Sequence, residues 1–145
     1  EDDWDLVMTV MLKGAFLAAK AVVPHMIEQR WGRIINISSR AHLGNPGQAN
    51  YSAAKAGLIG MAKALCKEEG RYGITVNSVA PGFIETEMVQ ALPTYEQIKE
   101  RAIEAQPIKR VGKPADIADA VAFLASERAS FISGETLHVT GGRFG

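Results

Sequence analysis

Apolar residues follow a helical period through the first part of the chain. They recur at three- and four-residue spacing, which places them on one helix face: Val7, Met8, Met11, Leu12, Ala15, Phe16 and Ala19. Asp2 and Asp3 stand where acidic side chains favour the start of a helix. Pro24 is expected to kink or end this helix, or to begin a short extension.

Short runs rich in β-branched residues alternate with helical patterns farther along. Strands are predicted at residues 33–38, 74–79 and 136–140, and helices at 51–72, at about 95–105 and from Pro114 onward. Residues 40–50 are rich in Gly, Pro and Asn and predict a loop, and 83–107 predicts a loop that contains the short middle helix. This alternation predicts parallel strands with helical crossovers, an α/β layered fold.

Turn-forming and polar residues follow each predicted strand, at positions 38–39, 80–82 and 140–141. In open α/β sheets, ligands bind beyond the carboxyl ends of the strands. Tyr51 begins the helix that follows the first of these ends. We therefore expect two serine hydroxyls, a Pro-Gly turn and the Tyr51 phenol at one edge of the sheet.

The composition excludes several classes of partner and site. Sixteen basic residues balance sixteen acidic ones, whereas nucleic-acid-binding proteins generally carry a basic excess. Cys66 is the only cysteine, so neither an intrachain disulfide nor a cysteine-based metal cluster can form. The three histidines are scattered and predict no metal site.

The start of the chain carries three acidic residues, the reverse of the basic start of a signal peptide. No uninterrupted apolar run is expected to be long enough to cross a bilayer. We therefore expect a soluble, cytoplasmic protein that has neither nucleic acid nor a membrane as its partner.

The stretch Tyr-Ser-Ala-Ala-Lys, residues 51–55, admits two interpretations. By spacing alone it is a half-buried tyrosine with a solvated lysine on an ordinary helix face. In context, the ammonium group of Lys55 lies near the phenol of Tyr51 and lowers its pKa, so that the phenol can exchange a proton near neutral pH. A serine at the preceding strand end could hold a carbonyl oxygen. Such a site suits ketone reduction or alcohol oxidation once a hydride carrier is present.

Five segments, in order along the chain, resemble the short-chain dehydrogenase/reductase family: GRIINISS, NYSAAKAGL, GITVNSVAPGFIETEM, DIADAVAFLAS and SGETLHVTGG. They cover nearly the whole sequence. APGFIET and GETLHVTGG are most similar to the 3-oxoacyl-(acyl-carrier-protein) reductase branch. The resemblance implies a Rossmann-like doubly wound parallel sheet. Residues 1–145 would form one partial domain, the C-terminal portion with three strands and crossover helices, without the N-terminal half.

The resemblance also implies roles for individual residues. Tyr51 would be the catalytic acid/base, and Lys55 would lower its pKa and hold the nicotinamide ribose. Ser39 would bind the substrate oxygen, as the second serine after the strand. Ser38 is the rival, because the loop to Tyr51 is one residue shorter than is usual in the family. We prefer Ser39, since the strand fixes its position and a loop absorbs a deletion more easily.

The resemblance further implies a cofactor and partners. The residues matching the cofactor-binding turn are Pro81, Gly82, Ile84 and Thr86. NADP(H) is favoured over NAD(H), although the selecting residues belong to the part of the pattern that this chain lacks. The expected partners are a small-molecule ketone or acyl thioester, an acyl carrier protein and further copies of the chain, as a tetramer or dimer. Arg30 is a candidate contact for the carrier, or else a solvated surface residue.

Two departures from the family pattern stand out. Met11 occupies the position of an asparagine that helps to hold a proton-relay water in the family. A thioether accepts hydrogen bonds weakly and donates none, so slower turnover is expected. The chain also contains no G-x-G-x-x-G turn for the cofactor pyrophosphate. The first predicted strand would then present an unpaired apolar edge.

Two functions from different classes follow. The first is an NAD(P)-dependent reductase that converts a ketone, a 3-oxoacyl thioester in particular, to a secondary alcohol. The second is a truncated, catalytically inactive member of the family that acts only as an oligomerisation module through its helix pair. A hydrolase built on Ser39 and His42 is disfavoured, because the sequence has no G-x-S-x-G turn.

Overall fold

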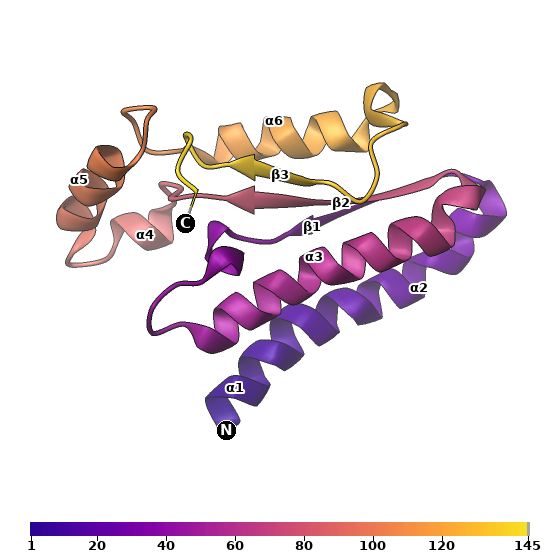
Figure 1. Ribbon diagram of the computed structural model, residues 1–145, viewed down its shortest axis with the longest axis horizontal. Coiled ribbons are helices and arrows are strands. Elements are labelled where there is room, and N and C mark those ends of the chain that lie inside the picture. Colours follow the sequence, from indigo (N-terminus) through magenta and orange to yellow (C-terminus); the bar gives the residue numbers. More distant parts are fainter. Residues whose placement is uncertain (145) are drawn as a thin grey trace.

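Three parallel strands form the centre of the computed structural model, which describes residues 1–144 (Figure 1). The strands are β1 (Gly32–Ile37), β2 (Ile74–Pro81) and β3 (Thr136–Val139), arranged in the order β1-β2-β3. Gly32 is paired with Ile74, and Ser78 with Thr136. All three carboxyl ends therefore reach the same edge of the sheet, and the predicted α/β class is confirmed.

Helices cover both faces of this sheet. The long helices α2 (Gly14–Gln29) and α3 (Ala49–Glu69) lie along one face, and α6 (Pro114–Ala125) lies along the other (Figure 1). Two shorter helices, α4 (Glu87–Gln90) and α5 (Tyr95–Ala105), lie beyond the carboxyl ends of the strands. The remaining elements are α1 (Asp2–Val7), the π-helical turn η1 (Met8–Lys13) and the 3-10 turns η2 (Arg40–Leu43), η3 (Gly70–Tyr72) and η4 (Glu127–Ala129).

The hydrophobic core lies on both sides of β2. Ile74 and Val76 pack with Ala62 of α3 on one face, and Val79 packs with Leu124 of α6 on the other. Residues 74–80 are all buried, as expected for the central strand of a parallel sheet. The continuous β-branched run that marked this strand in the sequence thus reflects burial on both faces.

Pro24 lies inside α2 and does not end it. The helix continues for five more residues and stops at Arg30, whose backbone is left-handed with φ 51°. Met26 and Ile27, beyond the proline, pack against the Ile74 cluster. Tertiary packing of these two side chains therefore outweighs the hydrogen bond that the proline removes.

The stretch Asp2–Gln29 corrects one sequence-based expectation. It is 28 residues long, and its most apolar window has a mean hydropathy of 1.8, so its length and composition suffice to cross a membrane. Core helices of soluble proteins and signal sequences meet the same criterion, so the finding is weak evidence for a membrane segment. Here the stretch packs against α3 and β1, although only 11% of that window is buried.

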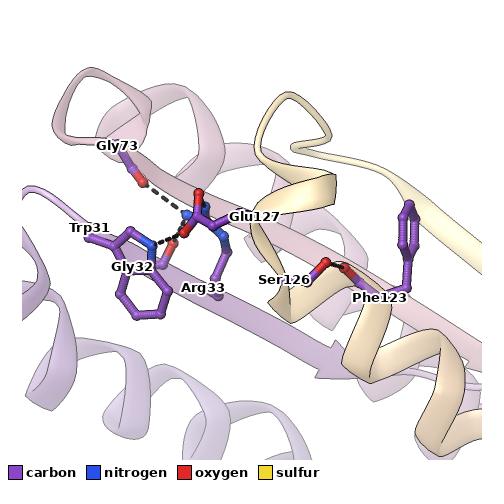
Figure 2. A network of polar contacts seen from close by, with 7 residues as sticks. All are labelled: Trp31, Gly32, Arg33, Gly73, Phe123, Ser126 and Glu127. Atoms are coloured by element: carbon purple, nitrogen blue, oxygen red, sulfur yellow. Dashed lines mark hydrogen bonds and ion pairs between the residues drawn. The ribbon is translucent and has the colours of Figure 1, made fainter.

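A polar network ties the amino ends of the strands together (Figure 2). The Arg33 guanidinium, with a side chain only 5% exposed, donates to the carbonyls of Gly32 (2.8 Å) and Gly73 (3.1 Å). It also pairs with Glu127 at 3.3 Å, which accepts a second bond from the Trp31 indole at 2.6 Å. The network joins β1, the turn before β2 and η4 at the edge opposite to the strand ends that carry the candidate site.

Gly73, in the turn before β2, provides a test of this packing. Its φ is +77°, and a Cβ there would lie 2.6 Å from the Arg30 carbonyl oxygen. We expect Gly73→Ala to lower the free energy of unfolding by about 1–3 kcal/mol, measured by urea denaturation, because the side chain is strained at this backbone conformation.

Gly70→Ala is the matched control in the same turn. Gly70 has helical φ −55°, and a Cβ there meets nothing within 4 Å. This variant should be neutral or stabilising by about 0.4–1 kcal/mol. Equal losses in the two variants would contradict the described turn.

Candidate active site

Three hydrogen bonds fix helix α3 against the end of strand β1. The Asn36 amide donates to the Leu58 carbonyl at 3.3 Å, and the Ser38 hydroxyl donates to the Lys55 carbonyl at 2.8 Å. The Lys55 ammonium in turn donates to the Ile37 carbonyl at 2.8 Å. Asn36 and Ser38 are two residues apart, so they face the same side of the strand, toward α3. The bonds therefore set the register of the helix on the strand.

The two serines at the end of β1 differ in their surroundings. Ser38 is 3% exposed, and its hydroxyl is engaged with α3. Ser39 is half-buried and lines the cleft that also holds Tyr51. The Ser39 Oγ accepts a hydrogen bond from the Ala41 N–H at 3.1 Å, which begins η2. Because that bond uses a lone pair of the oxygen, the hydroxyl proton stays free to donate.

The cleft opens at the carboxyl edge of the sheet and has a volume of about 790 Å³. Tyr51, near the start of α3, and the Pro81-Gly82 turn after β2 line it together with Ser39. A Cβ on Gly82 would lie 3.0 Å from the Thr140 Cα, so the close approach of β2 to the end of β3 favours a glycine. The predicted meeting of serine, phenol and Pro-Gly turn at one edge is confirmed.

Lys55 lies behind the Tyr51 ring and not in the cleft. Its Nζ is 5.5 Å from the ring centroid, and burial lowers the pKa of its ammonium group. It lines a separate groove of about 450 Å³ between α2 and the outer edge of β1, together with Met11 and Ile37. Ile37 is 42% exposed there. Tyr51 and Lys55 therefore stand between the cleft on one side and the groove on the other.

Two predicted cofactor residues lie away from the cleft. Ile84 forms an isolated bridge with Gly112 and lines a separate hollow of about 310 Å³. Thr86 is exposed, and its Oγ1 accepts a hydrogen bond from the Val89 N–H at 3.4 Å as the N-cap of α4. The Thr86 hydroxyl is thus engaged in capping. Arg30 stands at the opposite end of β1 from Ser39, so it is remote from the cleft.

Sequence reasoning missed other polar residues at this edge. Arg40 and Arg143 both line the cleft, one directly after Ser39 and the other after the Gly141-Gly142 turn. The rule that ligands bind beyond strand ends could have located both. His42 of η2 and His138 of β3 also meet here, and their Nε2 atoms share a hydrogen bond of 2.9 Å. No spacing rule predicts that contact, since 96 positions separate the two residues.

A sequence model described as enoyl-(acyl carrier protein) reductase matches residues 1–143. The 3-oxoacyl-(acyl-carrier-protein) reductase of Thermotoga maritima is 49% identical over 143 residues, 98% of this chain and 57% of the relative. The chain belongs to the short-chain dehydrogenase/reductase family. The predicted resemblance to the 3-oxoacyl reductases of this family is confirmed.

Other members of the short-chain dehydrogenase/reductase family are similar to this chain in sequence and in structure. The (2S)-[(R)-hydroxy(phenyl)methyl]succinyl-CoA dehydrogenase subunit of Thauera aromatica is 50% identical over 99% of this chain and 57% of that protein. The solved 3-oxoacyl-(acyl-carrier protein) reductase of Brucella melitensis superposes with a TM-score of 0.91 at 37% identity, over all of this chain and 54% of that one. The chain thus spans little more than half the length of these relatives.

The environment of Lys55 gives a prediction that requires no activity. Burial lowers the pKa of Lys55, whereas hydrogen bonds to Tyr95 and Glu85 raise the pKa of Lys99. In ¹⁵N-lysine NMR of the folded chain we expect Lys55 to lose its proton at a lower pH than Lys99. Lys55→Arg and Lys99→Arg assign the two signals. A Lys55 signal that titrates together with or above Lys99 would contradict the partial burial of this ammonium group.

Proposed function

We propose that the chain carries the catalytic residues of an NAD(P)H-dependent reductase that converts a ketone, specifically a 3-oxoacyl thioester, to a secondary alcohol. One observation carries the proposal: Ser39 and Tyr51 enter the same cleft from two elements in locked register, with the Lys55 ammonium behind the tyrosine ring. This is the arrangement that carbonyl reduction needs, with a donor for the oxygen and an acid held beside a cation.

Each side chain would have one role in the reaction. The Ser39 hydroxyl donates a hydrogen bond to the substrate carbonyl oxygen. Tyr51 delivers its proton to that oxygen while the carbonyl carbon receives a hydride, so the C=O π bond breaks and one C–H and one O–H bond form. The Lys55 ammonium stabilises the resulting phenolate. A bound reduced nicotinamide would supply the hydride, which no side chain can provide, and would be oxidised as it does so.

The residues around Lys55 fit the nicotinamide end of such a cofactor. An ammonium group has three donors, and the Ile37 carbonyl takes one of them, so two remain for ribose hydroxyls. The Pro81-Gly82 turn lies at the same edge of the sheet. No G-x-G-x-x-G turn for the pyrophosphate occurs in the chain. We propose NADP(H) in preference to NAD(H), on the resemblance to the 3-oxoacyl reductases.

The substrate class and the partners rest on the relatives. The Thermotoga maritima protein is named for 3-oxoacyl groups on an acyl carrier protein, and the Thauera aromatica protein for a coenzyme A thioester. An acyl thioester is the chemistry that these names share, so we propose it for this chain, in the cytoplasm. An acyl carrier protein could contact Arg30, although this residue lies at the far end of β1 from the cleft.

Self-association is supported by exposed apolar side chains along the stretch Asp2–Gln29. Those at least 40% exposed are Trp4, Leu6, Val10, Phe16, Leu17 and Val22. A Cβ on Gly57 would lie 2.7 Å from Leu12 Cδ2, so this stretch and α3 pack closely at that point. We propose a dimer or tetramer built on this stretch. If the chain proves inactive, association through it is the second candidate function.

Replacement of Tyr51 tests the proposed chemistry. In the protein that carries this chain, Tyr51→Phe should reduce NADPH oxidation with a 3-oxoacyl thioester by at least about 10²-fold, because the phenolic proton is lost. Ser39→Ala should cost about 10²–10³-fold through loss of a donor to the oxygen. Tyr72→Phe, beyond the other end of α3, is the matched control and should keep full turnover.

Ser38→Ala separates the two serines. It should keep most of the turnover but lower the free energy of unfolding by about 1 kcal/mol, because the bond to the Lys55 carbonyl is lost. Substantial activity in Tyr51→Phe would refute the mechanism, and a larger loss in Ser38→Ala than in Ser39→Ala would reassign the oxygen ligand. No turnover in the unmodified protein would favour the association module.

A further inference from the structure

The charged residues that line the cleft are all cationic. Arg40 comes from η2, Arg101 from α5 and Arg143 from the segment after β3. Within residues 1–144, no aspartate or glutamate lines this cleft. The chain as a whole is electrically neutral, so the cleft differs from the average surface. Three separate segments contribute the charges, and the fold brings them to one place.

Arg40 and Arg143 line the same cleft, where their like charges oppose each other. Arg40 is partly buried, and burial together with the positive charge of Arg143 lowers the pKa of its guanidinium. Neither is among the described ion pairs, whereas Arg33 and Arg110 meet carboxylates at 3.3 and 2.7 Å. A partly buried pair of like charges without a counter-ion costs free energy, and a bound anion removes that cost.

The two arginines lie in the part of the site that the substrate would occupy. Arg40 directly follows Ser39, the residue assigned to the carbonyl oxygen. The same cleft is also lined by apolar side chains, Phe83, Val89 and Ile98, that suit an acyl chain. Pro81 and Gly82 of the proposed cofactor turn line the same cleft. We assign an anion beside Arg40 to the substrate because Arg40 directly follows Ser39 in the chain.

We propose that the cleft selects a substrate that presents an anionic oxygen group to Arg40 and Arg143. Two sources share this chemistry: a carboxylate on the acyl chain, or a phosphate on the thiol that carries it. Planar guanidinium groups bind either through paired N–H donors. This inference rests on the proposed ketoreductase function and adds its substrate class.

Turnover of matched 3-oxoacyl thioesters tests the inference and distinguishes the sources. A thioester of N-acetylcysteamine that ends in a carboxylate is compared with its methyl ester, and the methyl ester is compared with the same acyl group on coenzyme A. A kcat/KM that is about 10–100-fold higher for the carboxylate identifies the acyl chain as the source. A kcat/KM that is higher by the same factor for the coenzyme A thioester than for the methyl ester identifies the phosphate as the source.

Arg40→Gln and Arg143→Gln should each remove most of that preference while the neutral methyl ester is still reduced. Arg128→Gln, an exposed arginine of η4 at the other end of the sheet, is the matched control and should change neither rate. Because each cleft variant removes one of two repelling charges, its Tm should not fall. Equal kcat/KM for all three substrates, or a preference that survives both substitutions, would overturn the inference and leave the reductase function intact.

A binding measurement covers the case in which no substrate is reduced. Calorimetric titration of the chain alone with glutarate, glutaramide and inorganic phosphate requires no cofactor. We expect glutarate or phosphate, but not glutaramide, to bind, and Arg143→Gln to weaken that binding about tenfold or more. Such binding without turnover would refute the reductase function only. No difference between glutarate or phosphate and glutaramide would refute the anion site itself.

Discussion

The hydrogen bonds between the end of β1 and helix α3 are the constraint on which the candidate site depends. Asn36 and Ser38 donate to carbonyls of α3, and Lys55 donates back to the Ile37 carbonyl. These bonds join main chain to side chain across the strand–helix boundary, so neither element can slide without breaking them. Because Ser38 is committed to the helix, the alternation of the strand turns Ser39 toward the cleft.

The same hydrogen bonds also place Tyr51 between two separate cavities. The ring stands between a cleft, which carries Ser39 and the two arginines, and a groove, which carries Lys55 and Met11. The proposed substrate would lie in the cleft, with the Pro81-Gly82 turn beside the nicotinamide, and Lys55 would reach the ribose from the groove side of the ring. The Ile37 carbonyl compensates part of the hydration that the partly buried Lys55 ammonium loses. The same bond thus positions the cation and sustains its burial.

Much of the fold could be predicted because local patterns and tertiary packing agree. The run at 74–79 predicted a buried strand, and Ser39, Tyr51 and the Pro81-Gly82 turn were placed at one edge by the rule for parallel sheets. The search for uninterrupted apolar runs did not show that Asp2–Gln29 is long and apolar enough to cross a membrane, because that depends on the composition of the whole helix. The rule that proline ends helices did not predict the course of α2 past Pro24, because it does not weigh tertiary packing. The positions of Ile84 and Thr86 depend on how the loop after β2 folds back, which strand and helix patterns do not specify.

The central claim is that this chain holds the nicotinamide end of the cofactor beside Tyr51 and Lys55. Saturation-transfer NMR on NADPH with the 145-residue chain tests it directly, since the method detects weak binding and resolves the two ends of the cofactor. We predict stronger transfer to the nicotinamide protons than to the adenine protons, and loss of that transfer in Lys55→Met. Transfer that favours adenine, that survives Lys55→Met, or that is absent from the folded chain would contradict the claim.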